Sequence, residues 1–206
     1  MRVFVSLAAA GFGIALPTAL GLAWPDYSPV ANFLSELGAT GAPHAALMSY
    51  AGFLPAGVLW AIGALSLLKG AQSKLLWMGA LLLLGTSISY IGAAVFPCDA
   101  GCPMEGSSSQ MMHNALGIIG YLTSPLGLAL IGVHFLRQAQ LTASVLSFAA
   151  ALATLIGFAM MANPDMESAR GAWQRLADFS LFIWLIAISV LLSKGESSAH
   201  SVPSDT

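Results

Sequence analysis

Charged residues are scarce in this sequence. Only 8% of its 206 residues are Asp, Glu, Lys or Arg, whereas a soluble domain carries about 25%. This number of charged side chains is too small to cover the surface of a water-soluble globule. Lipid must therefore solvate most of the chain. Seven Lys and Arg against nine Asp and Glu give a net charge of −2. The sequence holds no basic patch, which excludes nucleic acid as a partner.

Signatures of catalysis are also missing. The sequence has neither an HExxH zinc motif nor a recognisable nucleophile motif. It therefore identifies no catalytic residue and no metal-binding set, and it leaves the cofactor unknown. Cysteine is limited to Cys98 and Cys102. These absences exclude the commonest zinc-protease and hydrolase patterns.

Six apolar runs are long enough to cross a bilayer. Each approaches or exceeds the ~20 residues that a helix needs to span ~30 Å of hydrocarbon. Because backbone groups in lipid must pair internally, the runs are predicted to be helices. The fold class is therefore all-α, a polytopic membrane bundle of six transmembrane helices in one domain of residues 1–194. The predicted spans are residues 2–24, 44–68, 74–96, 111–136, 141–162 and 176–192.

The first run follows Arg2 and could be a signal peptide. It is longer than the usual ~7–15-residue apolar region of such peptides, and no small-x-small cleavage site precedes Pro25. We therefore expect the first run to remain as a span.

Basic residues predict the orientation. Five of the seven Lys and Arg lie at the N-terminus, in the second and fourth connections or at the C-terminal end of the last span, and two lie in or beside the fifth connection. Positive charge marks the cytoplasmic side. We predict a multi-pass protein of a bacterial cytoplasmic (inner) membrane, with both termini cytoplasmic and the odd-numbered connections outside. Residues 195–206 are predicted to be a disordered cytoplasmic tail.

The third connection, in FPCDAGCPMEGSSSQMMHNALG at residues 96–117, crowds polar and sulfur-bearing side chains between two apolar runs. Cys98 and Cys102 are predicted to form a disulfide there, because the outer compartment is oxidising. So small a loop contributes only about 2 kcal/mol, so the bridge fixes local shape. A redox-active pair is one alternative. Another is a Cu(I) site that also uses Met104, Met111, Met112 and His113.

The connections between the spans contain similar motifs, which indicate a repeated helical hairpin. WPDY, FPCD and NPDM end three outward-running helices, and a helix stop explains their prolines but not their aspartates. The returning helices HAALMSYAGFLPAG and HNALGIIGYLTSPLG both open with histidine and share Pro-x-Gly. We interpret spans 1–2 and 3–4 as two copies of one hairpin. Matching positions would then be His44 with His113, Asp26 with Asp99, and Pro55 with Pro125.

Asp178 lies inside the sixth predicted span. Counted from Trp173 as an interfacial anchor, it is roughly 7–8 Å deep at helical rise. A carboxylate at that depth marks a functional site, unless it forms a structural ion pair with Arg175 on the same helix face. Both interpretations remain open from the sequence. His134 is predicted to lie at the cytoplasmic interface, with its ring reaching toward water.

The first connection contains SPVANFLSELGATGAPH. Val30, Phe33, Leu34 and Leu37 recur at helical spacing, which predicts a short outer amphipathic helix on the membrane surface. Gly38 is placed to cap it. Ser35 and Glu36 then fall off the apolar stripe, available to solvent or to a site.

Three stretches of the sequence resemble a known protein family. YSPVANFLSELGA, FPCDAGCP with the serines and histidine that follow, and GAWQRLADFSLFIW resemble the bacterial and archaeal membrane family called domain of unknown function 998. The resemblance covers the chain to about Lys194, implies six helices and assigns no activity. Gln174 stands where members of the family often have an acid. The family-like positions are Tyr27, Ser28, Ser35, Glu36, Leu37, Gly38, Pro97, Cys98, Asp99, Cys102, His113 and Arg175.

The polar residues gather at the outer membrane face, and there we predict a pocket beneath the disulfide loop. The leading interpretation is an inner-membrane protein whose pocket binds a lipid headgroup, small solute or cation, as a transporter or accessory subunit. Its expected partners are the bilayer, a lipid or small-molecule ligand, and further copies of the chain. The candidate binding residues are Glu36, Asp99, His113, Arg175 and Asp178, with Asp26, Ser35 and His44 as secondary candidates.

Two other functions fit the sequence. One is a membrane-embedded, metal-dependent hydrolase or transferase acting on lipid, with the same carboxylates and histidine as ligands or as acid and base. The other is a structural membrane partner without a pocket, in which abundant small residues allow tight helix packing.

Overall fold

The computed structural model describes residues 1–69 and 72–200, and those residues contain helices but no strand. Within this part of the chain, six helical stretches are long and apolar enough to cross a membrane, which confirms the predicted fold class. Their length and composition are those of a multi-pass membrane protein. They are Arg2–Leu22, Ala45–Ser66, Lys74–Val95, Ser108–Arg137, Leu141–Met161 and Pro164–Lys194.

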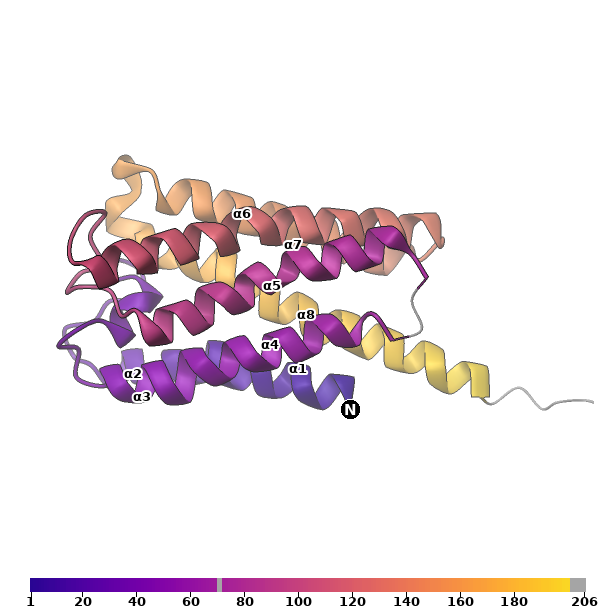
Figure 1. Ribbon diagram of the computed structural model, residues 1–206, viewed down its shortest axis with the longest axis horizontal. Coiled ribbons are helices and arrows are strands. Elements are labelled where there is room, and N and C mark those ends of the chain that lie inside the picture. The colour runs from indigo at the N-terminus through magenta and orange to yellow at the C-terminus, as the bar shows by residue number, and fades with distance from the viewer. Residues whose placement is uncertain (70–71, 201–206) are drawn as a thin grey trace, which may run out of the picture.

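The stretches run alternately up and down one bundle, so their connections gather at its two ends (Figure 1). The N-terminus and the C-terminal end of α8 (Arg170–His200) lie at the same end. The opposite end carries the connections of residues 23–44, 96–107 and 162–169, and we call it the disulfide end. Segments far apart in the sequence meet there.

The first two spans contain wide turns before their prolines. The N–H groups of Leu16 and Leu54 bond back five residues, to the carbonyls of Gly11 and Ser49. A proline is the next residue in each case, and the π-helical turn lets the span continue although proline offers no N–H. The segments are α1 (Arg2–Ala10), η1 (Gly11–Ala15) and α2 (Leu16–Leu22), then α3 (Ala45–Met48), η3 (Ser49–Phe53) and α4 (Leu54–Ser66).

Pro125 is accommodated differently, inside the continuous helix α6 (Ser108–Arg137). It offers no N–H to the carbonyl of Tyr121. The neighbouring Ser124 hydroxyl shares a 2.5 Å hydrogen bond with Thr86 of α5 (Lys74–Val95). Pro55 and Pro125 therefore sit in different local structures, although the sequences around them are similar.

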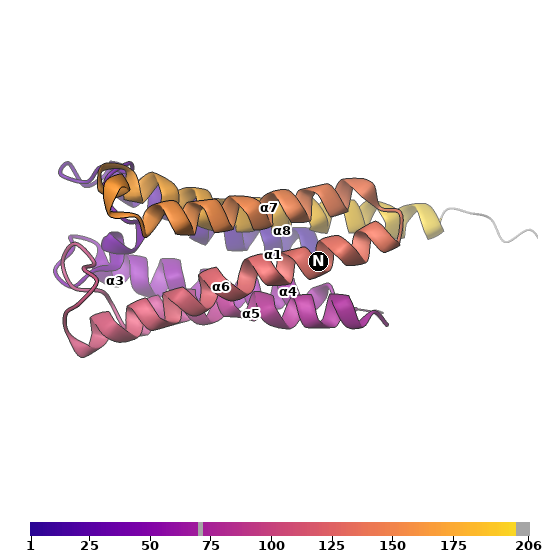
Figure 2. The same cartoon turned by 90° about the horizontal axis from the view of Figure 1, so that it is seen from above.

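Helix α6 crosses between two neighbours. It packs along α5 from Leu116 to Ile131 and comes beside α7 (Leu141–Met161) toward the opposite end (Figure 2). Glycines allow the approach to α5, because a Cβ on Gly79 would lie 2.8 Å from the Gly127 carbonyl oxygen and one on Gly92 would lie 2.6 Å from Leu116. As a result of this crossing, α6 and α7 separate toward the disulfide end.

Aromatic side chains fill the middle of the bundle, and buried hydroxyls join its helices. Trp60 packs edge-on against Phe182 with ring centroids 5.3 Å apart, and its indole N–H donates to the Leu83 carbonyl at 2.9 Å. The hydroxyls of Ser6 and Ser189 lie 2.7 Å apart and link α1 to α8. Such interhelical hydrogen bonds contribute about 0.6 kcal/mol each, so close packing supplies most of the association.

The sixth span is longer than the sequence predicts. Helix α8 begins at Arg170, after the turn η4 (Pro164–Ala169), rather than at residue 176. Both arginines of its first turns contact the first connection. The predicted tail is residues 195–206: helix α8 continues to His200, and residues 201–206 lie outside the described residues.

The predicted short helix of the first connection is present but buried. It is a single 3-10 segment, η2 (Leu34–Gly38), and all five of its residues are buried rather than laid on a membrane surface. Val30 lies outside it and is 53% exposed. Gly38 is not a left-handed cap, because its φ is not positive; instead it makes room for the Phe53 ring, which an added Cβ would approach to 2.7 Å.

Candidate functional site

Arg175 docks the first connection onto the start of α8. Its guanidinium donates to the carbonyls of Pro29 at 2.6 Å and Asn32 at 3.1 Å, and also to the Tyr27 hydroxyl. Burial raises the pKa of Tyr27, and the positive charge of Arg175 opposes that rise. Among the described residues Arg175 makes no ion pair with Asp178. Arg175 therefore fixes the first connection and does not neutralise the Asp178 carboxylate by an ion pair.

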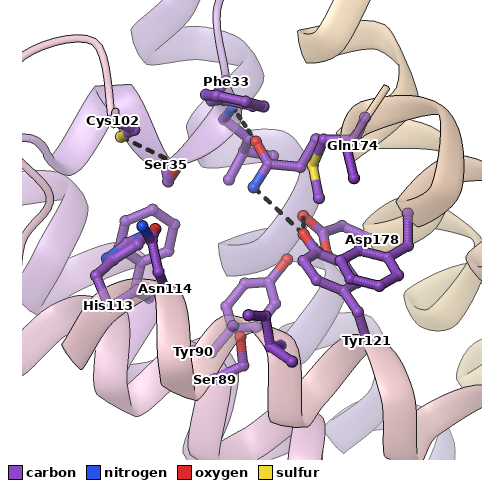
Figure 3. Close-up of a pocket in the computed structure, with 18 of the residues that line it drawn as sticks. Phe33, Ser35, Ser89, Tyr90, Cys102, His113, Asn114, Tyr121, Gln174 and Asp178 are labelled. Carbon is purple, nitrogen blue, oxygen red and sulfur yellow. Dashed lines mark hydrogen bonds between the residues drawn. The ribbon is translucent and has the colours of Figure 1, made fainter. Parts of the chain in front are cut away.

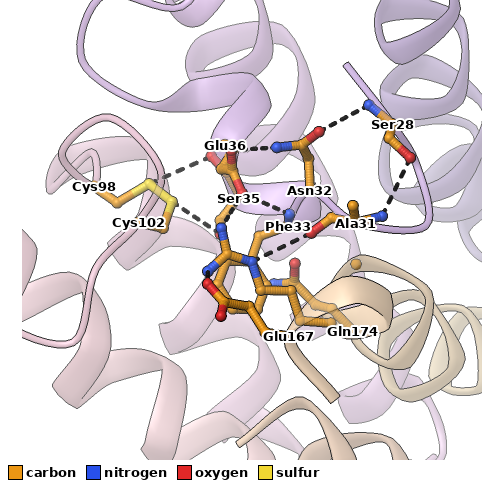
Figure 4. A network of polar contacts seen from close by, with 12 residues as sticks. Ser28, Ala31, Asn32, Phe33, Ser35, Glu36, Cys98, Cys102, Glu167 and Gln174 are labelled. Carbon is orange, nitrogen blue, oxygen red and sulfur yellow. Dashed lines mark hydrogen bonds and ion pairs between the residues drawn. A yellow bond between two sulfur atoms is a disulfide. The ribbon is translucent and has the colours of Figure 1, made fainter. Parts of the chain in front are cut away.

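Arg170 holds the other end of the same loop through Glu36 (Figure 4). The two charged groups lie 3.5 Å apart, and the Arg170 guanidinium stacks 4.5 Å over the Phe33 ring. The Glu36 carboxylate also accepts the Phe33 backbone N–H at 2.8 Å and the Asn32 side-chain amide at 2.9 Å. Glu36 is only 5% exposed, and these donors compensate for its burial. Its observed partners give it a structural role.

Cys98 and Cys102 form the predicted disulfide. Their loop packs on the first connection: the Ser35 hydroxyl lies 3.4 Å from the Cys102 sulfur, and the Thr40 N–H donates to the Cys98 carbonyl at 2.8 Å. Ligand atoms of Cys98, Cys102 and His113 lie within 4.8 Å of one another. In the disulfide neither sulfur is a thiolate, the form that binds a metal ion, so this cluster is not a metal site in its oxidised form.

Asp99 anchors the disulfide loop to the start of α6. Its carboxylate accepts the Ser107 backbone N–H and the Ser107 hydroxyl, each at 2.8 Å. The Ser107 backbone N–H is the main cause that lowers the pKa of Asp99, with the hydroxyl second. Asp99 does not line the cavity described next.

A cavity of about 190 Å³ lies at the disulfide end, where α6 and α7 separate (Figure 3). Its other walls come from η2, η3, α5 and α8, and Cys102 and Met104 of the disulfide loop border it. Most of the lining is apolar. No Lys or Arg of the described residues lines it, and its polar lining residues are Ser35, Ser89, Tyr90, His113, Asn114, Tyr121, Gln174 and Asp178.

Asp178 lies at one side of the cavity and is 4% exposed. The Tyr121 hydroxyl donates to its two carboxylate oxygens, at 3.1 and 3.2 Å. Gln174 fixes that hydroxyl, because its side-chain NH₂ donates to the Tyr121 oxygen at 3.3 Å while its carbonyl accepts the Leu34 N–H at 2.5 Å. A glutamate in place of Gln174 would accept from Tyr121 and compete with Asp178 for its single hydrogen.

His113 and Tyr90 present unused polar atoms. His113 Nδ1 lies 2.9 Å from the Phe96 carbonyl, which only accepts, so Nδ1 carries a hydrogen and Nε2 of the neutral ring keeps its lone pair. Tyr90 is 6% exposed, and its hydroxyl has no hydrogen-bond partner among the described residues. In Figure 3 Tyr90 lies between the side carrying His113 and the side carrying Asp178.

The structure brings together part of the predicted site. Ser35, His113 and Asp178 line the cavity, whereas Glu36, Asp99 and Arg175 shape the loops around it. Asp26 and His44, which the sequence places as secondary candidates, are exposed and do not line the cavity.

Sequence reasoning missed Tyr90, Tyr121 and Arg170, and it did not predict the role of Gln174. Tyr90 and Tyr121 lie in apolar helices where a tyrosine carries no distinguishing signal. Arg170 was assigned to a connection rather than to a helix. Gln174 was noticed only for its departure from the family pattern, and no pattern indicated that it would connect η2 to Tyr121.

One comparison with known proteins gives a match. The pattern of a family described as "Protein of unknown function (DUF998)" matches residues 7–191. No curated protein and no solved structure matches the chain. The match covers all six spans wholly or in part and both loops that enclose the cavity. The chain therefore belongs to the DUF998 family of membrane proteins.

Proposed function

We propose that this protein binds a lipid-like amphiphile in the cavity, from the outer leaflet of a bacterial inner membrane. The observation that carries the proposal is an apolar cavity that contains a buried carboxyl group and is lined by residues of both α6 and α7 at the disulfide end. The distribution of Lys and Arg supports an orientation with the disulfide end outside. A transporter or an accessory subunit would both use such a site.

The lining favours an amphiphile over a polar solute. Apolar residues make up most of the wall, and the polar atoms are few, which is the usual make-up of a site that fixes one polar group of a largely apolar ligand. A volume of about 190 Å³ is below the roughly 300–1,000 Å³ of sites that enclose a drug-sized ligand. We infer that the cavity holds a headgroup or chain end, and that the rest of the ligand extends between α6 and α7 into the bilayer.

The metal-dependent hydrolase receives less support. A catalytic zinc site usually takes three protein ligands. Glu36 already accepts from Arg170, Asn32 and the Phe33 N–H, and Asp99 accepts twice from Ser107. His113 and Asp178 are the remaining members of that predicted set in the cavity wall.

Filling the cavity tests the proposal. Gly117 lines the cavity, and a Cβ there would meet nothing within 4 Å, so a leucine side chain at this position enters open space. Gly11 is an exposed helical glycine of the first span with equally open surroundings, which makes Gly11→Leu a matched control.

The measurement is native mass spectrometry of protein extracted from bacterial inner membranes. We expect the unaltered protein and Gly11→Leu to carry a bound lipid-like mass, and Gly117→Leu to lose it while keeping its thermal unfolding midpoint. Equal occupancy in Gly117→Leu would refute a ligand in this cavity.

A further inference from the structure

We propose that the polar group bound in this cavity is a primary alkylammonium, a protonated amine at the end of an apolar chain. This inference rests on the proposed function and names its ligand class. The ammonium could belong to a membrane lipid with an amine headgroup or to a free long-chain amine, and both present the same –NH₃⁺ to the site.

The charge distribution of the cavity favours a cation. Among the residues that the structure describes, Asp178 is the one acid that lines the cavity, and no Lys or Arg lines it. The two arginines nearest in sequence are engaged with the first connection, Arg175 through backbone carbonyls and Arg170 through Glu36. A phosphate or carboxylate would therefore meet a carboxyl group with no cation to offset it, whereas an ammonium would supply the missing partner.

The unused hydrogen-bonding capacity is mainly that of acceptors. A carboxylate has about four lone-pair sites, and within the described part of the chain Asp178 receives only the single hydrogen of Tyr121. His113 keeps a lone pair on Nε2. The Tyr90 hydroxyl, which can donate or accept, is buried and has no partner among the described residues. An ammonium brings three N–H donors, which suits this set.

The amide groups in the wall do not change that balance. Asn114 donates to the carbonyls of Pro103 at 3.2 Å and Met104 at 3.0 Å, and its own carbonyl accepts from Gln110 at 2.9 Å. Gln174 is engaged at both ends in the same way. Both donors of Asn114 are in use, and Gln174 spends one of its two N–H groups on Tyr121; neither amide carries the charge that would offset an anion.

A quaternary ammonium fits less well. Such cations are usually held by the open faces of several aromatic rings. Here Tyr121 is stacked on Phe158 with centroids 5.1 Å apart, and Tyr90 makes edge contacts with Phe53 and Phe182. These rings pack against each other, and a group without N–H would leave the Asp178 and His113 acceptors unfilled.

The test compares four eight-carbon probes on purified full-length protein in phosphatidylcholine nanodiscs at neutral pH. The probes are octylamine, which is protonated there because alkyl amines have a pKa near ~10, octyltrimethylammonium, octanol and octanoate. Each probe also partitions into lipid, so site binding is the difference between the protein and Gly117→Leu at equal lipid content, measured by isothermal titration calorimetry.

We expect octylamine to bind about tenfold or more tightly than octanol, and octanoate to bind most weakly. Asp178→Asn should reduce that preference by about tenfold or more, and octanol binding that still exceeds that of Gly117→Leu shows that the variant keeps its cavity. If octanol or octanoate matches octylamine and Gly117→Leu blocks them all, the ammonium inference is overturned and the amphiphile site stands. If no probe distinguishes the protein from Gly117→Leu, the proposed function fails as well.

A second arm identifies the source of the ammonium. Protein from nanodiscs of equal parts phosphatidylethanolamine and phosphatidylcholine is examined by native mass spectrometry. Retention of phosphatidylethanolamine by the protein but not by Asp178→Asn supports the inference with a lipid as the source. Octylamine binding without such retention supports it with a free amine as the source. Preferential retention of phosphatidylcholine would contradict it.

Discussion

Gly171 is the point where the first connection touches α8 most closely. A Cβ at Gly171 would overlap the Asn32 carbonyl and would lie 2.9 Å from the Pro29 carbonyl oxygen. Both are backbone atoms, so they cannot turn away as a side chain would. The Ala172 N–H also donates to the Val30 carbonyl at 3.0 Å, which holds the loop in place. Gly171→Ala must therefore push the loop off the helix.

The size of the effect follows from the bonds at stake. Loss of the Ala172–Val30 hydrogen bond costs about 1 kcal/mol, and loss of one charge-assisted bond from Arg175 costs about 1.5–3 kcal/mol. The higher helix propensity of alanine returns up to about 1 kcal/mol. We expect Gly171→Ala to lower the free energy of unfolding by about 1.5–4 kcal/mol.

Unfolding in mixed micelles titrated with a denaturing detergent measures the stability change, and hydrogen exchange of residues 28–38 reports the loop. Gly117→Ala is the control, because its added methyl group meets open space; it should be neutral or stabilising by up to about 1 kcal/mol. If Gly171→Ala behaves like Gly117→Ala and its loop stays protected, then the first connection does not dock on α8 as described.

Two further predictions concern the disulfide end. The hydrogen bonds from Ser107 lower the pKa of folded Asp99, so its carboxylate stabilises the loop fully above the ordinary pKa of 3.8 and loses that effect as the pH falls through the lower folded value. We expect hydrogen exchange of residues 99–110 to rise in this acid range in the unaltered protein and not in Asp99→Asn. An identical pH response in the variant would contradict the assignment. The predicted orientation puts Gly106 outside the cytoplasm and Gln72 inside it. A reporter that is active only outside the cytoplasm should therefore work when fused at Gly106 and fail when fused at Gln72. The reverse pattern would refute both the orientation and the outer-leaflet site.

The helices could be predicted because hydropathy acts along the chain. A run of some 20 apolar residues must be helical in lipid whatever surrounds it, so the six spans follow from composition and length. Local spacing is equally decisive for Cys98 and Cys102, which are close enough in sequence to pair without help from the rest of the fold. The family resemblance likewise depends on short local motifs and is confirmed over residues 7–191.

The site was only partly predictable, because residue spacing along one helix does not show which side chains of the other helices will contact it. Arg175 and Asp178 are three residues apart and share a helix face. Arg175 nevertheless donates to the carbonyls of Pro29 and Asn32. Asp178 instead accepts a hydrogen bond from Tyr121 of α6. Glu36 was expected to be available, but Arg170, over 130 residues away, covers it.

The sequence by itself determined that the chain lies in a membrane, how many times the described part can cross it, and which two sulfurs join. Only the tertiary structure decided which polar side chains face a common cavity. The physical reason is that helix rotation and crossing set those faces. The π turns at η1 and η3 shift the helical register. The packing of α6 against both α5 and α7 brings Tyr121 to Asp178 of α8, a geometry that no local pattern encodes.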